Sequence, residues 1–197
     1  LSGASSHTGG TTITAGTLRL GDGGSLAATG ALTVNGGTFN LNNHDQTVGP
    51  LSGIGGTIAL GSGTLTANSA FLFTSTLTTA ITGTGGFVKN GGELLILQGA
   101  NSYTGGTTVN TGRLRLDGSL ASTGALTVNG GRLEPGLLSN QTGILTTQSL
   151  VLGAGGTLAL DLKGQVAGTG HDQVRVTGGA IVLNGATLEL TSNGPLT

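Results

Sequence analysis

The amino-acid sequence predicts an all-β protein built as a β-solenoid, a coil of short strands that stack on copies of themselves. Three observations lead to this fold: short runs of alternating apolar and polar residues, glycine-glycine steps between those runs, and an internal duplication. Glycine accounts for 41 of the 197 residues, whereas charged residues make up only 8%. Disordered chains tend to be rich in charge and poor in β-branched residues, so this Thr-, Leu- and Val-filled composition indicates a folded chain.

Each expected strand carries two apolar residues two positions apart. In a strand such residues point to one face, and the polar residues between them point to the other. The longest stretch without glycine, 64–82, shows no helical apolar stripe, so no helix is expected. The pairs that we expect to face a shared interior are Leu18/Leu20, Leu32/Val34, Phe39/Leu41, Ile58/Leu60, Leu94/Ile96, Leu114/Leu116, Leu126/Val128, Leu158/Leu160 and Leu188/Leu190.

Glycine-glycine steps stand between these strands. Glycine adopts positive φ without a steric penalty, so we expect it to form tight corners. The steps are Gly36-Gly37, Gly55-Gly56, Gly91-Gly92, Gly130-Gly131 and Gly155-Gly156.

An internal duplication is the strongest signal in the sequence. Residues 1–20 (LSGASSHTGGTTITAGTLRL) align without gaps to residues 97–116 (LQGANSYTGGTTVNTGRLRL). Residues 25–37 then match residues 119–131 at all but one position. Fainter echoes pair 53–60 with 153–160, and His44-Asp45-Gln46 with His171-Asp172-Gln173. These offsets indicate one continuous array and not two domains joined by a linker.

A sandwich or barrel of antiparallel hairpins remains an alternative at this stage. Asn-Gly, the usual dipeptide of two-residue hairpin turns, begins at Asn35, Asn90, Asn129, Asn184 and Asn193. The expected strands are short for a sandwich, however, and single apolar faces that repeat monotonously favour a solenoid.

Composition excludes several classes of function. A formal net charge of −1 with scattered lysines and arginines gives no footprint for nucleic acid, so no nucleic-acid partner is expected. Cysteine is absent, which removes disulfides, thiolate nucleophiles and cysteine-based metal sites. No apolar run approaches the roughly 20 residues of a membrane helix. The chain begins inside a repeat and without a leader, so we expect it to be a piece of a longer protein.

No catalytic, cofactor-binding or metal-binding residue is expected. The sequence has no G-x-S-x-G elbow, and Ser25 and Ser119 are interpreted as turn residues. Glycan-cleaving enzymes need carboxylates held close together, but here the acids are isolated along the chain. They are Asp22, Asp45, Glu93, Asp117, Glu134, Asp161, Asp172 and Glu189. Because stacked coils would bring distant acids together, a glycan-active β-helix remains an open alternative.

Residues 167–175 (AGTGHDQVR) nearly fit the calcium nonapeptide of β-roll proteins. Such sites bind calcium between adjacent turns and need tandem copies, and this chain holds one. We therefore interpret Asp172 as the cap of a turn that precedes a strand containing Val174 and Val176.

Residues 83–116 (GTGGFVKNGGELLILQGANSYTGGTTVNTGRLRL) resemble the passenger-associated transport repeat of bacterial autotransporters. The pattern of that repeat falls on Lys89, Gly99, Ala100, Asn101, Tyr103, Thr104, Gly105, Gly106, Thr107, Thr108, Val109, Gly112 and Leu114. A degenerate copy at 1–20 has Ser5 and His7 where the pattern has Asn and Tyr. Residues 143–190 also resemble the segment that often follows such repeats.

The resemblance implies a right-handed parallel β-helix over residues 1–197, with repeat copies at about 1–41 and 83–135 and a folding-competent segment at 141–193. It implies an extracellular location on a Gram-negative cell, with the passenger tethered to an outer-membrane β-barrel that lies outside this chain. The expected function is a structural or adhesive stalk, with a host-surface or matrix ligand, or self-association, as its partner. The alternative is the non-catalytic stem of a secreted protease or esterase.

Overall fold

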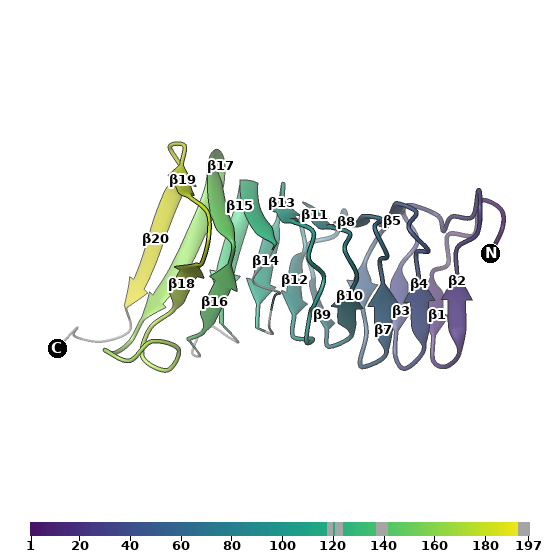
Figure 1. The fold of residues 1–197 in the computed structure, drawn as a ribbon, viewed down its shortest axis with the longest axis horizontal. Coiled ribbons are helices and arrows are strands. Elements are labelled where there is room, and N and C mark those ends of the chain that lie inside the picture. Colours follow the sequence, from purple (N-terminus) through teal and green to yellow (C-terminus); the bar gives the residue numbers. More distant parts are fainter. Residues whose placement is uncertain (118–119, 121–123, 137–141, 193–197) are drawn as a thin grey trace.

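The computed structural model shows an elongated stack of coils with one end of the chain at each end of the stack (Figure 1). The structure describes residues 1–117, 120, 124–136 and 142–192. The expected turn at Ser119 and both ends of the predicted segment 141–193 lie outside this part of the chain. The described residues form strands and no helix. No membrane-spanning helix is therefore present among them.

Strands of successive coils lie on three faces of the stack. Face 1 contains β1 (Thr11–Ile13), β3 (Leu32–Val34), β6 (Leu51–Ser52), β9 (Thr74–Leu77), β12 (Leu94–Leu97), β14 (Arg113–Leu116) and β20 (Thr187–Ser192). Face 2 contains β2 (Thr17–Arg19), β4 (Thr38–Asn40), β7 (Thr57–Ala59) and β10 (Ala80–Thr82), and a separate pair, β16 (Ile144–Thr147) and β18 (Gln173–Val176), follows along the chain. Face 3 contains β5 (Gln46–Val48), β8 (Leu65–Ser69), β11 (Phe87–Gly91), β13 (Thr107–Val109) and β19 (Ile181–Leu183).

Two long strands turn the corner between two faces. β15 (Ala125–Pro135) and β17 (Ser149–Leu162) begin on face 3, where they pair with β13 and β19, and end on face 1, where they pair with β14 and β20. The register between them shifts after Val128, at Gly130. The steps Gly130-Gly131 and Gly155-Gly156 therefore lie inside long bent strands, not between strands as expected.

Every pair of named strands is parallel, which confirms the solenoid and removes the hairpin sandwich. The register gives the length of a coil: Leu32 pairs with Leu51, and Thr107 pairs with Leu126, each 19 residues further on. The coils lengthen toward the C-terminal end, where Leu150 pairs with Ile181, 31 residues further on. This coil period of about 19 residues is much shorter than the spacing of the internal duplication, and it was not predicted from the sequence.

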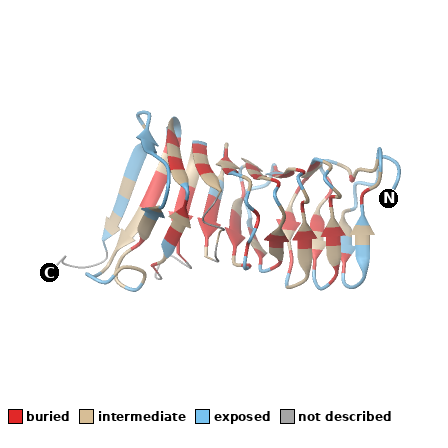
Figure 2. Ribbon diagram, viewed as in Figure 1, coloured by how far each residue is buried: buried red, intermediate tan, exposed pale blue. Residues whose placement is uncertain are grey.

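One continuous apolar interior runs along the stack (Figure 2). Most of the predicted inward pairs lie in it, and Leu18 and Leu160 pack against it from partly buried positions. The pair Leu94/Ile96 was assigned to the wrong side of its strand. Leu95 and Leu97 face the interior instead, because a run of four apolar residues has no alternation from which to choose a side. Leu188 and Leu190 keep the register of Leu158 and Leu160 but lie exposed on the terminal coil.

The two copies of the duplication lie on different faces. Thr11 of β1 corresponds to Thr107 of β13 in the sequence alignment. β1 lies on face 1, where the bridge from Gly53 to Leu77 carries the stack on to β9. β13 lies on face 3, between β11 and β15. The duplicated segments are therefore related by a rotation of about one third of a turn, so a similar strand sequence suits either of two faces.

Close approach of neighbouring coils requires glycine at the corner between faces 3 and 1. Gly91, Gly112 and Gly131 occupy this corner in successive coils, with φ values of 76°, 73° and 80°. A Cβ atom on Gly112 would lie 2.2 Å from the carbonyl oxygen of Gly91, and one on Gly131 would lie 2.5 Å from that of Gly112. Gly92, which follows Gly91 at the corner, does not have a positive φ, so the predicted conformational reason holds for only part of the glycine steps.

The substitutions Gly112→Ala and Gly16→Ala separate the two reasons for glycine. Gly16 has a similar φ of 69°, but a Cβ there would meet no atom within 4 Å. We expect Gly16→Ala to lower the free energy of unfolding by about 1–2 kcal/mol, which is the cost of the left-handed conformation. Gly112→Ala should lose about 1–3 kcal/mol more from overpacking, measured by denaturant unfolding. Equal losses in the two variants would show that coil spacing does not constrain this corner.

Candidate interaction surface

The repeat motif at 99–109 supplies polar groups that close the interior of a coil. Tyr103 is buried, and its hydroxyl lies 2.6 Å from the Thr107 hydroxyl. Burial raises the pKa of Tyr103. Asn101 takes the place of a strand on face 2: its Oδ1 accepts from the Ile81 N–H at 3.0 Å, and its Nδ2 donates to the Gly99 carbonyl at 3.0 Å. Buried polar groups need such partners, so these motif residues are structural.

The degenerate first copy keeps part of this arrangement with different residues. His7 stands at the position of Tyr103, and its Nε2 lies 3.0 Å from the hydroxyl of Thr11, the counterpart of Thr107. His7 also forms a hydrogen bond with Ser5 through Nδ1. Both residues are more exposed than their counterparts because they lie on the first coil.

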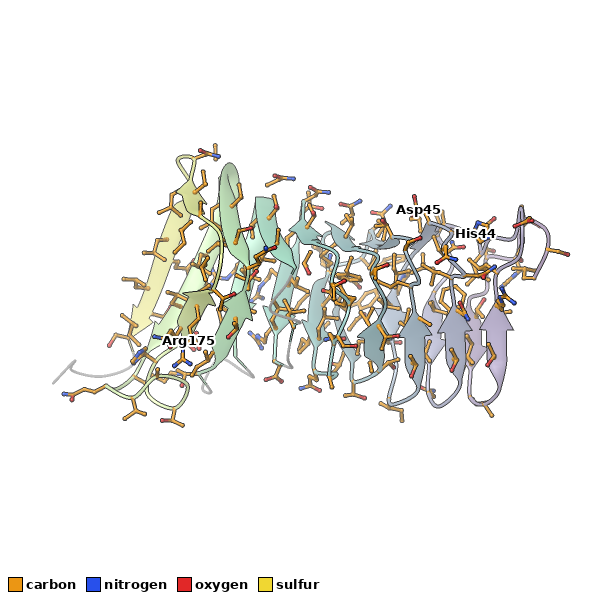
Figure 3. The ribbon with its side chains drawn as sticks, in the orientation of Figure 1. His44, Asp45 and Arg175 are labelled. Atoms are coloured by element: carbon orange, nitrogen blue, oxygen red, sulfur yellow. The ribbon has the colours of Figure 1, made fainter. Side chains whose placement is uncertain are left out.

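The two His-Asp-Gln echoes cap neighbouring backbone. In the first, Asp45 accepts from the Thr64 N–H at 2.7 Å, and buried Gln46 accepts from the Leu26 N–H at 2.8 Å. In the second, the two oxygens of Asp172 accept from the N–H groups of Gly143 at 2.7 Å and Asp161 at 2.8 Å. Figure 3 shows His44 and Asp45 in the N-terminal half and Arg175 near the other end. The bonds of Asp172 support its interpretation as a turn cap.

An ionic network covers part of the outer side of face 1. Glu134 Oε1 accepts from Arg113 Nη2 at 2.6 Å and from Arg132 Nε at 2.7 Å, and its Oε2 accepts from Arg115 Nη2 at 2.6 Å. Arg132 also bonds Glu189, with Nη2 2.8 Å from Oε1. Arg115 and Glu134 are themselves buried. Sequence reasoning missed this network, although its signal is present: R-x-R at 113–115 and R-x-E at 132–134 are one coil apart, 19 residues.

Opposing effects set the pKa of Glu134. Burial alone would raise it, but hydrogen bonds from Arg113, Arg115 and Arg132 together outweigh burial and hold the pKa below the ordinary 4.5. A hydrogen bond from Arg132 likewise lowers the pKa of exposed Glu189. Both groups are therefore carboxylates at neutral pH, which suits ion pairs and not general acids.

A second charged pair lies inside the corner between faces 3 and 1. Lys89 and Glu93 are both fully buried. Lys89 Nζ donates to the carbonyls of Asn90 at 2.6 Å and Gly91 at 3.0 Å. Glu93 Oε2 accepts from Ser75 at 3.1 Å, whereas its Oε1 has no hydrogen-bond partner. Burial lowers the pKa of Lys89 and raises that of Glu93.

The coils do bring distant carboxylates together, but in arrangements already occupied. Glu134 and Glu189 share Arg132, and Asp161, which bonds Lys163 at 3.1 Å, lies next to Asp172. Burial is the main reason that the pKa of Asp172 is raised. Both oxygens of Asp172 nevertheless face backbone donors. Among the described residues, no group of three or more His, Asp or Glu could hold a metal ion.

The outer side of face 3 carries a row of asparagines along the stack. This asparagine row consists of Asn68, Asn90, Asn110 and Asn129, one residue from each of four successive coils. Asn110 Nδ2 donates to Asn90 Oδ1 at 2.9 Å, and Asn129 Nδ2 donates to Asn110 Oδ1 at 2.9 Å. Asn90 and Asn129 each begin an Asn-Gly dipeptide, which left hairpin turns open as an alternative. In the stack they form an outward-facing row.

The substitution Glu134→Gln tests the ionic network. Because the folded-state pKa of Glu134 lies below 4.5, its contribution to stability is complete above that pH and falls as pH drops through the lower folded value. At pH 7 we expect a loss of about 3 kcal/mol, since three guanidiniums lose their shared anion. The variant should also lose less additional stability than the wild type below pH 4.5. Denaturant unfolding monitored by circular dichroism across pH 7 to pH 3 measures both effects.

Glu189→Gln is the matched control, because it removes an exposed carboxylate from the rim of the same network. Its effect at pH 7 should be small. If Glu134→Gln were as mild as Glu189→Gln, the network would not stabilise face 1.

Comparison with known proteins agrees with this architecture. The family model of the passenger-associated transport repeat matches residues 1–20, 87–116 and 111–134. The chain is also 42% identical over 121 residues to the adhesin BmaC autotransporter of Brucella suis biovar 1. That match covers 58% of this chain and only 4% of the relative. No solved structure matches.

The matched residues include the structural groups described above. Asn101, Tyr103 and Thr107 lie in the second match, as do the corner glycines Gly91 and Gly112. The sequence pattern of the family and the stacking of the coils thus coincide in the same residues. Residues 1–20 and 87–134 therefore match passenger-associated transport repeats, and 121 residues of the chain are similar to part of an autotransporter adhesin.

Proposed function

We propose that this chain is a non-catalytic, adhesive part of a passenger stalk that is displayed on the surface of a Gram-negative bacterium. The observation that carries the proposal is the stack of parallel coils, which presents a row of asparagines from four successive coils on its outer surface. A relative named as an adhesin supports the adhesive role. Because the chain spans only 4% of that relative, the function of the whole protein belongs to the proposal.

The ionisable groups favour this role over catalysis. The carboxylates that approach one another are held by arginines, a lysine or backbone N–H groups. Burial keeps Lys89 and Glu93 away from solvent. The described residues line a hollow at the N-terminal end, near Leu1, Arg19 and Asp22. Asp22 is the one carboxylate in its lining, and none of the carboxylates that approach one another lies there. As the partner of this adhesive surface, we propose a ligand on a host cell or in its matrix.

Surface display tests the adhesive function. The chain would be displayed through a carrier barrel on a non-adherent bacterium, with its surface level measured by antibody. We expect several-fold more bacteria to bind epithelial cells or matrix-coated wells than bacteria with the empty carrier. The control is Leu126→Asp at the same display level, because a charge at this buried position disrupts the stack. Equal binding by the chain and the empty carrier would contradict the proposal, and clumping without binding would indicate self-association.

We also propose that the C-terminal part of the chain folds first and serves as a template for the coils before it. The long strands β15 and β17 lie there, whereas the strands of the first coils have two or three residues. A solenoid coil contacts only its neighbours, so stability varies along the stack. A stable block that emerges first would draw the chain outward as each coil adds to it.

Hydrogen exchange on the whole chain tests this order. Amides of β15 and β17 should exchange most slowly, and those of residues 1–63 should exchange first. Limited proteolysis should leave a fragment that begins near Gly83. Greatest protection within residues 1–63, or uniform protection of both halves, would contradict the proposed order.

A further inference from the structure

The asparagine row ends beside two exposed aromatic rings. Between β8 and β9 the chain makes a short excursion, and Phe71 and Phe73 lie on it with exposed fractions of 64% and 41%. Their ring centroids are 6.0 Å apart and the planes are inclined by 28°. The protein has only five aromatic residues, and the described structure buries Phe39, Phe87 and Tyr103. Exposed rings are costly in water, so a pair of them indicates a contact surface.

The excursion lies against the corner from which the asparagine row continues. Leu72 reaches over Gly92, with its Cδ2 2.7 Å from the position of a Cβ there. The amide N–H of Phe71 donates to Ser69 Oγ at 3.4 Å, which ties the excursion to the end of β8. Asn68 and Asn90 are in register on the neighbouring strands. The excursion that carries the exposed rings therefore adjoins the Asn68–Asn90 end of the row at the corner that follows face 3.

The amides keep hydrogen-bonding capacity toward solvent. Each Asn side chain has two N–H donors and two acceptor lone pairs, and a bond along the row uses one of each. The bonds from Asn110 to Asn90 and from Asn129 to Asn110 leave the second donor and the second lone pair of Asn110 free for a ligand. The row is thus a series of fixed donors and acceptors at the strand spacing of about 4.8 Å.

This surface carries no net charge. Lys89 and Glu93 are adjacent to it in sequence but fully buried. Arg113 and Arg132, which follow the asparagines along the chain, are paired with Glu134. A polyanion would therefore find no unpaired cation among these residues.

We propose that the asparagine row and the Phe71–Phe73 pair bind an uncharged, extended glycan, which would be the ligand class of the adhesive function proposed above. One sugar unit in an extended β-1,4-linked chain is slightly longer than the spacing between strands. Because neighbouring units alternate in orientation, different hydroxyls of successive units come close to successive amides. The apolar C–H face of a sugar ring packs on an aromatic face, as other apolar groups do. The row fixes the direction of the chain, and the rings fix one end of it.

Isothermal titration of the whole chain with cellohexaose and chitohexaose tests the proposal, with a heparin hexasaccharide as the anionic comparison. We expect a neutral hexasaccharide to bind and heparin not to bind. Phe71→Ala/Phe73→Ala should weaken binding at least about tenfold, which corresponds to about 1.4 kcal/mol. Asn110→Ala should weaken it about threefold to tenfold, since it removes the centre of the row. Ile54→Ala and Asn35→Ala remove a similar exposed apolar side chain and a similar exposed asparagine at the corner between faces 1 and 2, outside the surface, and should bind as the wild type does.

Side-chain amide NMR signals of the wild-type chain give a second readout that does not depend on how the variants fold. Shifts of the Asn90 and Asn110 signals on addition of the neutral hexasaccharide would support the proposal. It is overturned if no neutral hexasaccharide binds, if only heparin binds, or if the phenylalanine and control variants bind equally. Adhesion of displaying bacteria without binding to these glycans would overturn the ligand class and leave the adhesive function standing.

Discussion

Parallel hydrogen bonding between successive coils is the constraint on which the rest of this structure depends. Each coil has its backbone donors and acceptors satisfied by the next coil, at a spacing of about 4.8 Å, so side chains can occupy only certain positions. At the corner of Gly91, Gly112 and Gly131 this spacing leaves no room for a Cβ atom. Within the strands, the same spacing places similar side chains of successive coils on top of each other, as with Leu126 and Leu150. A glycine-rich sequence with an apolar alternation is a consequence of this one spacing.

The buried polar residues form hydrogen bonds with backbone groups that the stacking of the coils leaves without a strand partner. Where a coil has no strand on one face, the strand of the neighbouring coil keeps backbone groups that need partners. Asn101 supplies one for β10, and Gln46 supplies both a donor and an acceptor for Leu26. The repeat motif therefore combines glycines for close approach with amide and hydroxyl groups for coils that lack a strand. This explains why residues with functional chemistry, such as Tyr103 and His7, have structural roles here.

Few residues of the protein are charged, and the pKa of each buried charged group depends on its surroundings in the stack. On face 1, arginines outweigh the desolvation of Glu134 and keep it ionised. In the corner, desolvation dominates for both Lys89 and Glu93, and one oxygen of Glu93 has no hydrogen-bond partner. The two sites therefore oppose one another as pH falls: protonation costs the network of Glu134 its attraction but relieves the desolvation of Glu93. The outer side of face 3 contains neither charge, which leaves an amide and aromatic surface.

Residue patterns in the sequence were enough to predict the all-β solenoid, most of the interior residues and the repeats at 1–20 and 87–134. Period-two alternation and glycine spacing are patterns of residues that are close in sequence, so they can be recognised without the structure. The sequence could not determine the side of β12 that faces inward, because four successive apolar residues carry no alternation. Nor could it determine which face each repeat copy occupies, because that depends on the lengths of all the coils between them. The network of Glu134, the asparagine row and the ring pair of Phe71 and Phe73 are contacts between coils or at a corner, and only the tertiary register brings their members together.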